Sequence, residues 1–250
     1  MDIRRAIPLL AAALVFAGCT DPPAVAGPPS PSLAAPSSSP PRSLAPTRVT
    51  YPARGSEQWY QAGAESGTAG RSGRLLRYRV LVERDIHGLA AGDFATAVST
   101  TLDDSRSWTA GGTVRLHRVG PGQPYEFTIY LATPGTRDDL CLGTPDGYTS
   151  CRAMDRVVLN VARWVKGAPA FGANLASYRQ YMVNHEVGHR LGRGHELCPG
   201  PGRPAPVMQQ QTLGLHGCTP NPWPYVDGRS YAGRSGAYDD PVPPRDPGVH

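Results

Sequence analysis

Three histidines and one glutamate in the second half of the chain have the spacing of a metal site that activates water. His185 and His189 are four residues apart, so on a helix they share a face and can point both rings at one ion. Glu186 is rotated from His185 by about 100°, which suits a base beside the ion better than a ligand. Gly192 lets the chain turn, and His195 returns as a third nitrogen. The pattern HExxHxxGxxH predicts one Zn²⁺ per chain with an open fourth position.

A helix must hold this pattern in place. Residues 175–191 contain no proline and stop at Gly192, so we expect one helix over this range. Val183, Val187 and Leu191 recur every four residues on the face away from the histidines. We expect that apolar face to pack against a sheet.

The chain before this helix alternates between strand and helix patterns. Alternating or short apolar runs predict four strands, at residues 74–84, 113–119, 125–133 and 157–165. Asp93 stands as an N-cap before Phe94, Val98 and Leu102, whose spacing predicts an amphipathic helix. Residues 137–152 are polar and rich in turn formers, so a loop is expected there.

The five motif residues resemble the long zinc motif of the metzincin clan of zinc metallopeptidases. That resemblance implies an α+β fold with a twisted, mainly parallel sheet and two main helices, over about residues 74–217. It also implies a methionine turn after the zinc helix, followed by an irregular C-terminal segment. Pro206-Val207-Met208 matches this turn, with a methionine that only fills a core gap as the alternative.

The resemblance has departures. Some metzincins carry a tyrosine two positions after that methionine, and this chain has Gln210 there. Tyr225 or Tyr231 could take the role of that tyrosine, or simply pack. Taken whole, the chain also resembles a family of actinobacterial exported lipoproteins with the same zinc motif, which implies no substrate.

The N-terminal residues have the composition of an export signal and a linker. Arg4 and Arg5 precede an apolar run that ends in Phe16-Ala17-Gly18-Cys19, which resembles a bacterial lipobox with Cys19 as the lipidated residue. Cleavage without lipidation is the alternative. Residues 20–48 are dominated by proline, serine, alanine and glycine, so we expect a tether to the membrane. The sequence therefore predicts a signal peptide over 1–19, a tether over 20–48, a zinc metallopeptidase domain over 49–235 and a disordered tail over 236–250.

Four cysteines remain if Cys19 is lipidated, and an even number in an exported chain favours two disulfides. Three pairings are possible. We expect Cys141 to pair with Cys151 and Cys198 with Cys218, because each pair brackets a loop rich in glycine and proline.

The formal net charge is +5, but the basic residues are scattered singly along the chain, which argues against a nucleic-acid partner. We therefore expect a monomeric, extracytoplasmic peptidase, an endopeptidase rather than an exopeptidase, acting on a peptide or protein. Glu186 would serve as the general base. The alternatives are a non-catalytic metal-binding protein of the cell envelope and an amide hydrolase acting on peptidoglycan peptides.

Overall fold

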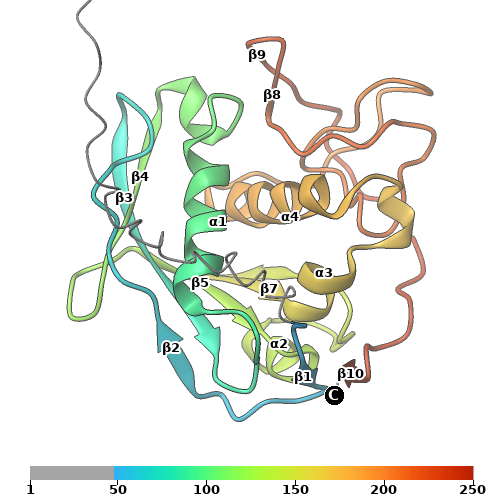
Figure 1. Ribbon diagram of the computed structural model, residues 1–250. Helices are drawn as coiled ribbons and strands as arrows, with labels where there is room; N and C mark the ends of the chain where they lie inside the picture. The colour runs from blue at the N-terminus through green and yellow to red at the C-terminus, as the bar shows by residue number, and fades with distance from the viewer. Residues whose placement is uncertain (1–47, 250) are drawn as a thin grey trace, which may run out of the picture. The chain divides into compact units, whose positions relative to one another are not determined.

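A six-stranded mixed sheet forms the centre of the computed structural model, which describes residues 48–249 (Figure 1). β3 pairs in parallel with β4 and β5, and β5 pairs in parallel with β7. β2 and β6 are antiparallel to their neighbours, and β6 is an edge strand beyond β7. The strands are β2 (Trp59–Gln61), β3 (Arg74–Glu83), β4 (Val114–Arg118), β5 (Phe127–Ala132), β6 (Cys151–Ala153) and β7 (Arg156–Asn160).

Four α-helices pack around this sheet. α1 contacts β3, β4 and α4, and α4 contacts β7 and β6. The helices are α1 (Ala91–Asp103), α2 (Pro134–Leu140), α3 (Val161–Lys166) and α4 (Leu175–Arg190), with 3₁₀ turns at Trp108–Gly111 and Pro169–Phe171. Two short pairs complete the fold: β1 (Tyr51–Pro52) with β10 (Gly248–Val249), and β8 (Tyr225–Val226) with β9 (Arg229–Ser230). The predicted α+β class with a mostly parallel sheet is confirmed.

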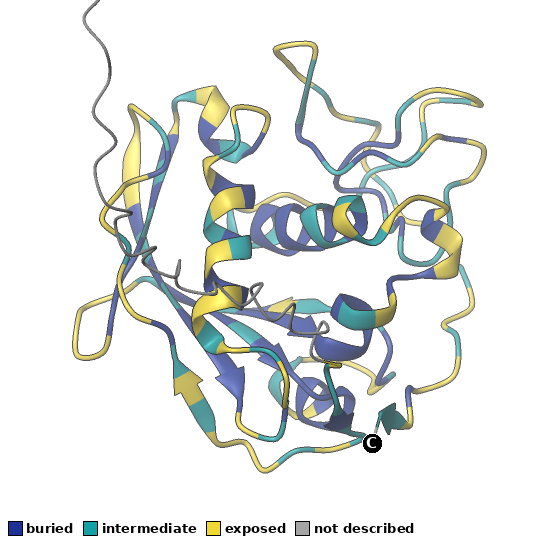
Figure 2. Cartoon of the chain, in the orientation of Figure 1, coloured by how far each residue is buried: buried dark blue, intermediate teal, exposed yellow. Residues whose placement is uncertain are grey.

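The core lies between the sheet and the helices α1 and α4. The period-two residues of β3, from Leu76 to Val82, are buried, as are the inward residues Phe94 and Val98 of α1. Figure 2 shows the central strands and most of α4 as buried. Val183 and Val187 are fully buried, so the apolar face predicted for α4 does pack inward. None of the helices in residues 48–249 is long and apolar enough to cross a membrane.

Two element boundaries differ from the prediction. α1 begins at Ala91, so Asp93 lies within its first turn rather than at the N-cap. The strand expected over residues 157–165 ends at Asn160, where α3 starts. The reason is local, because the Asn160 side chain accepts a hydrogen bond from the Ala162 backbone N–H at 2.9 Å and so caps a new helix.

The segment expected as a loop over residues 137–152 contains more structure than predicted. α2 begins at Pro134, whose fixed φ suits the first turn of a helix, and β6 forms at the far end. Both predicted disulfides, Cys141–Cys151 and Cys198–Cys218, are confirmed. The first of them ties the end of α2 to the start of β6.

The tail predicted as disordered over residues 236–250 is wrong for the described residues up to Val249. These residues belong to the same compact unit as the sheet, and β10 pairs with β1. Asp246 is only 6% exposed and lies 2.8 Å from the Lys166 ammonium and 3.3 Å from the Arg163 guanidinium. A buried carboxylate held by two cations anchors the segment. The domain predicted over residues 49–235 therefore extends to the β10 strand.

Acid is expected to weaken this anchor. Burial raises the pKa of Asp246, but the Lys166 hydrogen bond and the Gly248 N–H outweigh it, so the pKa lies below its usual 3.8. A depressed pKa means that the stabilisation is complete above pH ~4 and is lost as the pH falls through the folded-state pKa. Thermal unfolding is measured from pH 7 to pH 2. We expect Asp246→Asn to have a lower Tm than wild type at pH 7, and its Tm to fall less than that of wild type as the pH is lowered. Asp239 is exposed, so Asp239→Asn is the control and should have the same Tm as wild type at each pH. The same change of Tm with pH in all three proteins would contradict the role of Asp246 as the anchor.

The predicted signal peptide, the lipidation site Cys19 and most of the tether lie outside residues 48–249.

Candidate metal centre

Helix α4 and the turn that follows it bring three imidazoles together. The Nε2 atoms of His189 and His185 are 3.1 Å apart, and those of His189 and His195 are also 3.1 Å apart. One nitrogen from each of the three rings lies within 4.8 Å of the others. The residues predicted as ligands are thus assembled in one place, and the group could hold a metal ion.

The turn after α4 explains how His195 returns to the helix. Gly192 has φ +88°, a left-handed conformation that favours glycine. Its N–H donates to the His189 carbonyl at 3.1 Å, and the Arg193 N–H donates to the Gly188 carbonyl at 2.9 Å. These two bonds make a Schellman motif, so the glycine predicted to end the helix does so.

Hydrogen bonds of two of the imidazoles determine which ring nitrogen is available to a metal. His185 Nδ1 donates to the Val207 carbonyl at 2.8 Å, and His189 Nδ1 donates to the Arg193 carbonyl at 2.8 Å. A carbonyl can only accept, so in the neutral rings Nε2 carries a lone pair. Lone pairs that face one another at this distance repel, and a cation between them removes the repulsion. The donor set therefore fits a metal that prefers imidazole nitrogen.

Burial keeps the three rings in the neutral form that binds metal. It lowers the pKa of His185 and His189, and it lowers that of His195 to about 4, with the charge of His189 as a second cause. Neutral imidazole is the ligand form of histidine.

Glu186 is a buried carboxylate on the wall of the same cleft. The residue is 6% exposed, and its Oε2 has no hydrogen-bond partner within the described residues. Burial raises its pKa to about 8, against a smaller opposing effect of the Arg137 charge. An unpartnered buried carboxylate oxygen is costly unless something binds it, and a water or a substrate group in the cleft would do so.

A tight turn packs against α4 at the level of the histidines. Gln209 N–H donates to the Pro206 carbonyl at 2.9 Å, which closes a turn around Val207 and the buried Met208. Gly188 lies between the two helical histidines, and a Cβ at that position would overlap the Met208 sulfur. The buried Met208 therefore packs directly against the helix that carries His185 and His189.

The open side of the centre is a cavity of about 470 Å³. Strand β6 and the residues before it, including Cys151 and Arg152, line one wall, and the turn after α4 lines another. In the described chain the side of β6 facing away from β7 makes no backbone hydrogen bonds. The cavity therefore offers a free strand edge beside the histidines.

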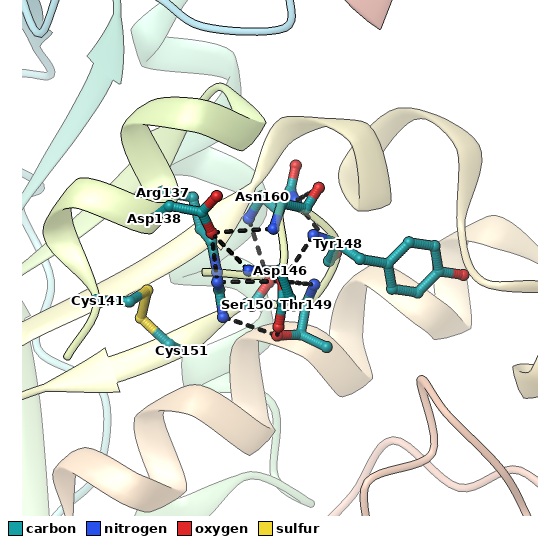
Figure 3. The surroundings of a disulfide bond; sticks show 10 residues. Arg137, Asp138, Cys141, Asp146, Tyr148, Thr149, Ser150, Cys151 and Asn160 are labelled. Carbon is teal, nitrogen blue, oxygen red and sulfur yellow. Dashed lines mark hydrogen bonds and ion pairs between the residues drawn. A yellow bond between two sulfur atoms is a disulfide. The ribbon is translucent and has the colours of Figure 1, made fainter. Parts of the chain in front are cut away.

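A buried polar network holds residues 146–148, which lead into the cavity wall at Thr149, Ser150 and Cys151 (Figure 3). Asp138 accepts hydrogen bonds from Arg137 at 2.7 Å and from the Gly147 N–H at 2.9 Å, and it also pairs with Arg245. Burial raises the pKa of Asp138, but these partners lower it by more, so the carboxylate stays ionised. Asn160 fixes the same stretch by donating to the carbonyls of Gly147 and Tyr148.

Of the other candidate site residues, some line the cavity and others lie elsewhere in the molecule. Gln210 lines the cavity, whereas Tyr225 and Tyr231 do not; the Tyr231 hydroxyl donates to the Pro204 carbonyl instead. Tyr181 was not predicted as a site residue, yet its ring lies 5.2 Å from that of His185 and it lines the cavity. Its position four residues before His185 on the same helix is the signal that could have identified it.

The fold and the site define an α+β protein with a three-histidine group able to hold a metal in an open cavity. Residues 45–217, more than half of the chain, match a family described as "Protein of unknown function (DUF3152)". The chain belongs to this family. Among curated proteins and among solved structures, nothing matches the chain.

Proposed function

We propose that the protein is an exported zinc metallopeptidase that hydrolyses peptide bonds with Glu186 as general base. The observation that carries this proposal is the arrangement around the cavity. One ring nitrogen from each of His185, His189 and His195 converges on one point, and the unpartnered Glu186 carboxylate lines the same space. A purely structural site has no use for such a carboxylate and usually has a fourth protein ligand.

The residues present fit zinc chemistry. Three neutral imidazoles suit Zn²⁺, which supplies a lowered pKa for water and polarisation of the substrate carbonyl when bound. The carbonyls of Val207 and Arg193 hold two of the rings in the tautomer that binds metal. Glu186 would accept the proton of the attacking water and deliver it to the leaving amine. A neighbouring dication favours the ionised form of Glu186 that this role needs.

The cavity also supports an extended peptide as substrate. The free edge of β6 can add a strand through backbone hydrogen bonds, which bind a peptide without regard to its side chains. Gln210 lies in the cavity and is the nearby side-chain amide that could donate to the carbonyl oxygen of the substrate.

The proposal includes membership of the metzincin clan. The order of sheet, α1, α4 and the turn at Met208 supports a metzincin-like fold. The two disulfides support a location outside the cytoplasm, where thiols are oxidised. Lipidation at Cys19 and a monomeric state remain part of the same proposal.

The test combines metal analysis with cleavage. The purified protein should contain one zinc per chain and should cleave a quenched fluorescent peptide library, and a zinc chelator should stop the cleavage. One zinc without any cleavage would favour a non-catalytic metal-binding protein or a peptidoglycan substrate, which muropeptides would then distinguish. A protein that binds no metal would overturn the proposal.

A further inference from the structure

Four arginines around the cavity have no acidic partner. Arg74, Arg152, Arg190 and Arg193, called here the arginine band, form no ion pair with any carboxylate of residues 48–249. Some arginines of residues 48–249 are paired, such as Arg77 with Glu126 at 2.7 Å, and others, such as Arg203, are unpaired but do not line the metal cavity. The band is therefore a local excess of positive charge.

The band connects the metal cavity with a second one. Arg152 and Arg193 line the metal cavity, while Arg193, Arg74 and Arg190 line a neighbouring cavity of about 400 Å³. Gly192 and Arg193 belong to both linings, so the turn after α4 separates the two spaces. Among the described residues, no carboxylate lines the second cavity, and Glu186 is the one acidic residue lining the first.

The charges of the band act on one another. Arg190 Nη2 donates to the main-chain carbonyl of Glu126 at 3.1 Å, and its buried Nε has no partner in the described structure. Because Arg74, Arg190 and Arg193 line one cavity, their positive charges repel one another. An anion among them would relieve the repulsion and supply the missing acceptors.

The second cavity also has apolar walls. Trp108, Leu76 and Leu191 contribute to its lining, and the Arg193 guanidinium lies 5.7 Å from the centre of the Trp108 ring. An apolar wall beside guanidinium groups suits a carboxylate carried on a short aliphatic stem. A glutamate or aspartate side chain has that form, and so does a peptide C-terminus.

We propose that the arginine band binds a carboxylate of the peptide substrate, which is either an acidic side chain or the C-terminus. This inference rests on the proposed peptidase function for its catalytic consequence. The binding itself depends only on the arginines and can be measured without cleavage.

The first arm of the test measures binding to a Glu186→Gln protein, which should not consume the probe. Three labelled peptides of one length are compared by fluorescence anisotropy: one with internal glutamates and an amidated C-terminus, one with glutamine in their place and a free C-terminus, and the amidated glutamine peptide. We expect at least one carboxylate peptide to bind about tenfold or more tightly than the neutral peptide, as for charge-assisted hydrogen bonds, and to weaken in high salt. The peptide that binds better identifies the carboxylate as a side chain or a C-terminus. Equal affinity for all three would overturn the proposal.

The second arm uses charge reversal. Arg152→Glu should lower the affinity for the preferred peptide about tenfold or more, and in the wild-type background should lower its kcat/KM to a similar extent. Arg203 is exposed, lines neither cavity and forms no ion pair with the described carboxylates, so Arg203→Glu is the control of equal net charge and should behave as wild type. Equal losses in both variants would mean that only the overall charge matters and would overturn the proposal. Tight binding of acidic peptides without any cleavage would retain the arginine site and reject the peptidase.

Discussion

Glu186→Gln is expected to retain one metal ion per chain and to lose peptide hydrolysis by a factor of about 10²–10⁴, the usual contribution of a positioned acid or base. Glutamine has the same shape but cannot accept the proton of the attacking water. The ligand histidines keep their carbonyl partners at Val207 and Arg193, so metal binding should not change. Metal content and kcat/KM on the preferred peptide measure the two effects separately.

Glu196→Gln is the matched control. Glu196 also adjoins a ligand histidine, and burial raises its pKa as well, but it lies outside the cavity lining and accepts the Gly233 N–H at 2.9 Å. Glutamine keeps that acceptor, so this variant should hydrolyse peptide nearly as wild type does. His189→Ala should lose both metal and activity. A fully active Glu186→Gln protein would rule out the proposed role of the carboxylate.

Asp138→Ala is expected to destabilise the protein by about 3–5 kcal/mol, the cost of removing one partner of a buried ion pair. Arg137 is 5% exposed and would lose the carboxylate that it contacts at 2.7 Å, keeping only the more distant one of Asp146 at 3.1 Å. The Gly147 N–H would lose its acceptor at the same time. Denaturant unfolding gives the free energy directly.

The next residue along the chain provides the control for this variant. Asp139 also pairs with an arginine, Arg54, but both side chains are substantially exposed. An exposed pair contributes about 0–1 kcal/mol, so Asp139→Ala should stay within that range of wild type. Similar losses for the two variants would mean that the Asp138 network does not carry the stability assigned to it.

The metal-binding group could be predicted because its chemistry is local in sequence. His185 and His189 share one helix, Gly192 ends it, and His195 follows within one turn, so spacing alone brings the rings together. The two disulfides were predictable for a similar reason, since each joins cysteines across one short loop. The strands β3 and β4 could be predicted because alternate residues are buried along them, and β5, which is buried on both faces, because it is a short apolar run.

Features that depend on distant segments could not be predicted. The arginines of the band come from β3, β6, α4 and the turn after it, and each stands alone in the sequence as an ordinary surface charge. Asp246 likewise lies in a segment rich in proline, and nothing near it in the chain reveals Arg163 or Lys166 as partners. Short elements such as β6 and α3 lack enough residues to show a period.

The pairing of β1 with β10 has a consequence for the order of folding. It joins Tyr51 to Val249, and the hydrogen bond from Tyr51 to Asp246 spans 195 residues. Closing so large a loop costs entropy that only the finished core can repay, so β1 and β10 are expected to pair after the sheet has formed. The sheet and α4 can therefore assemble before β10 pairs with β1. Until that pairing forms, Arg163 and Tyr51 lack the Asp246 carboxylate that they contact in the folded domain.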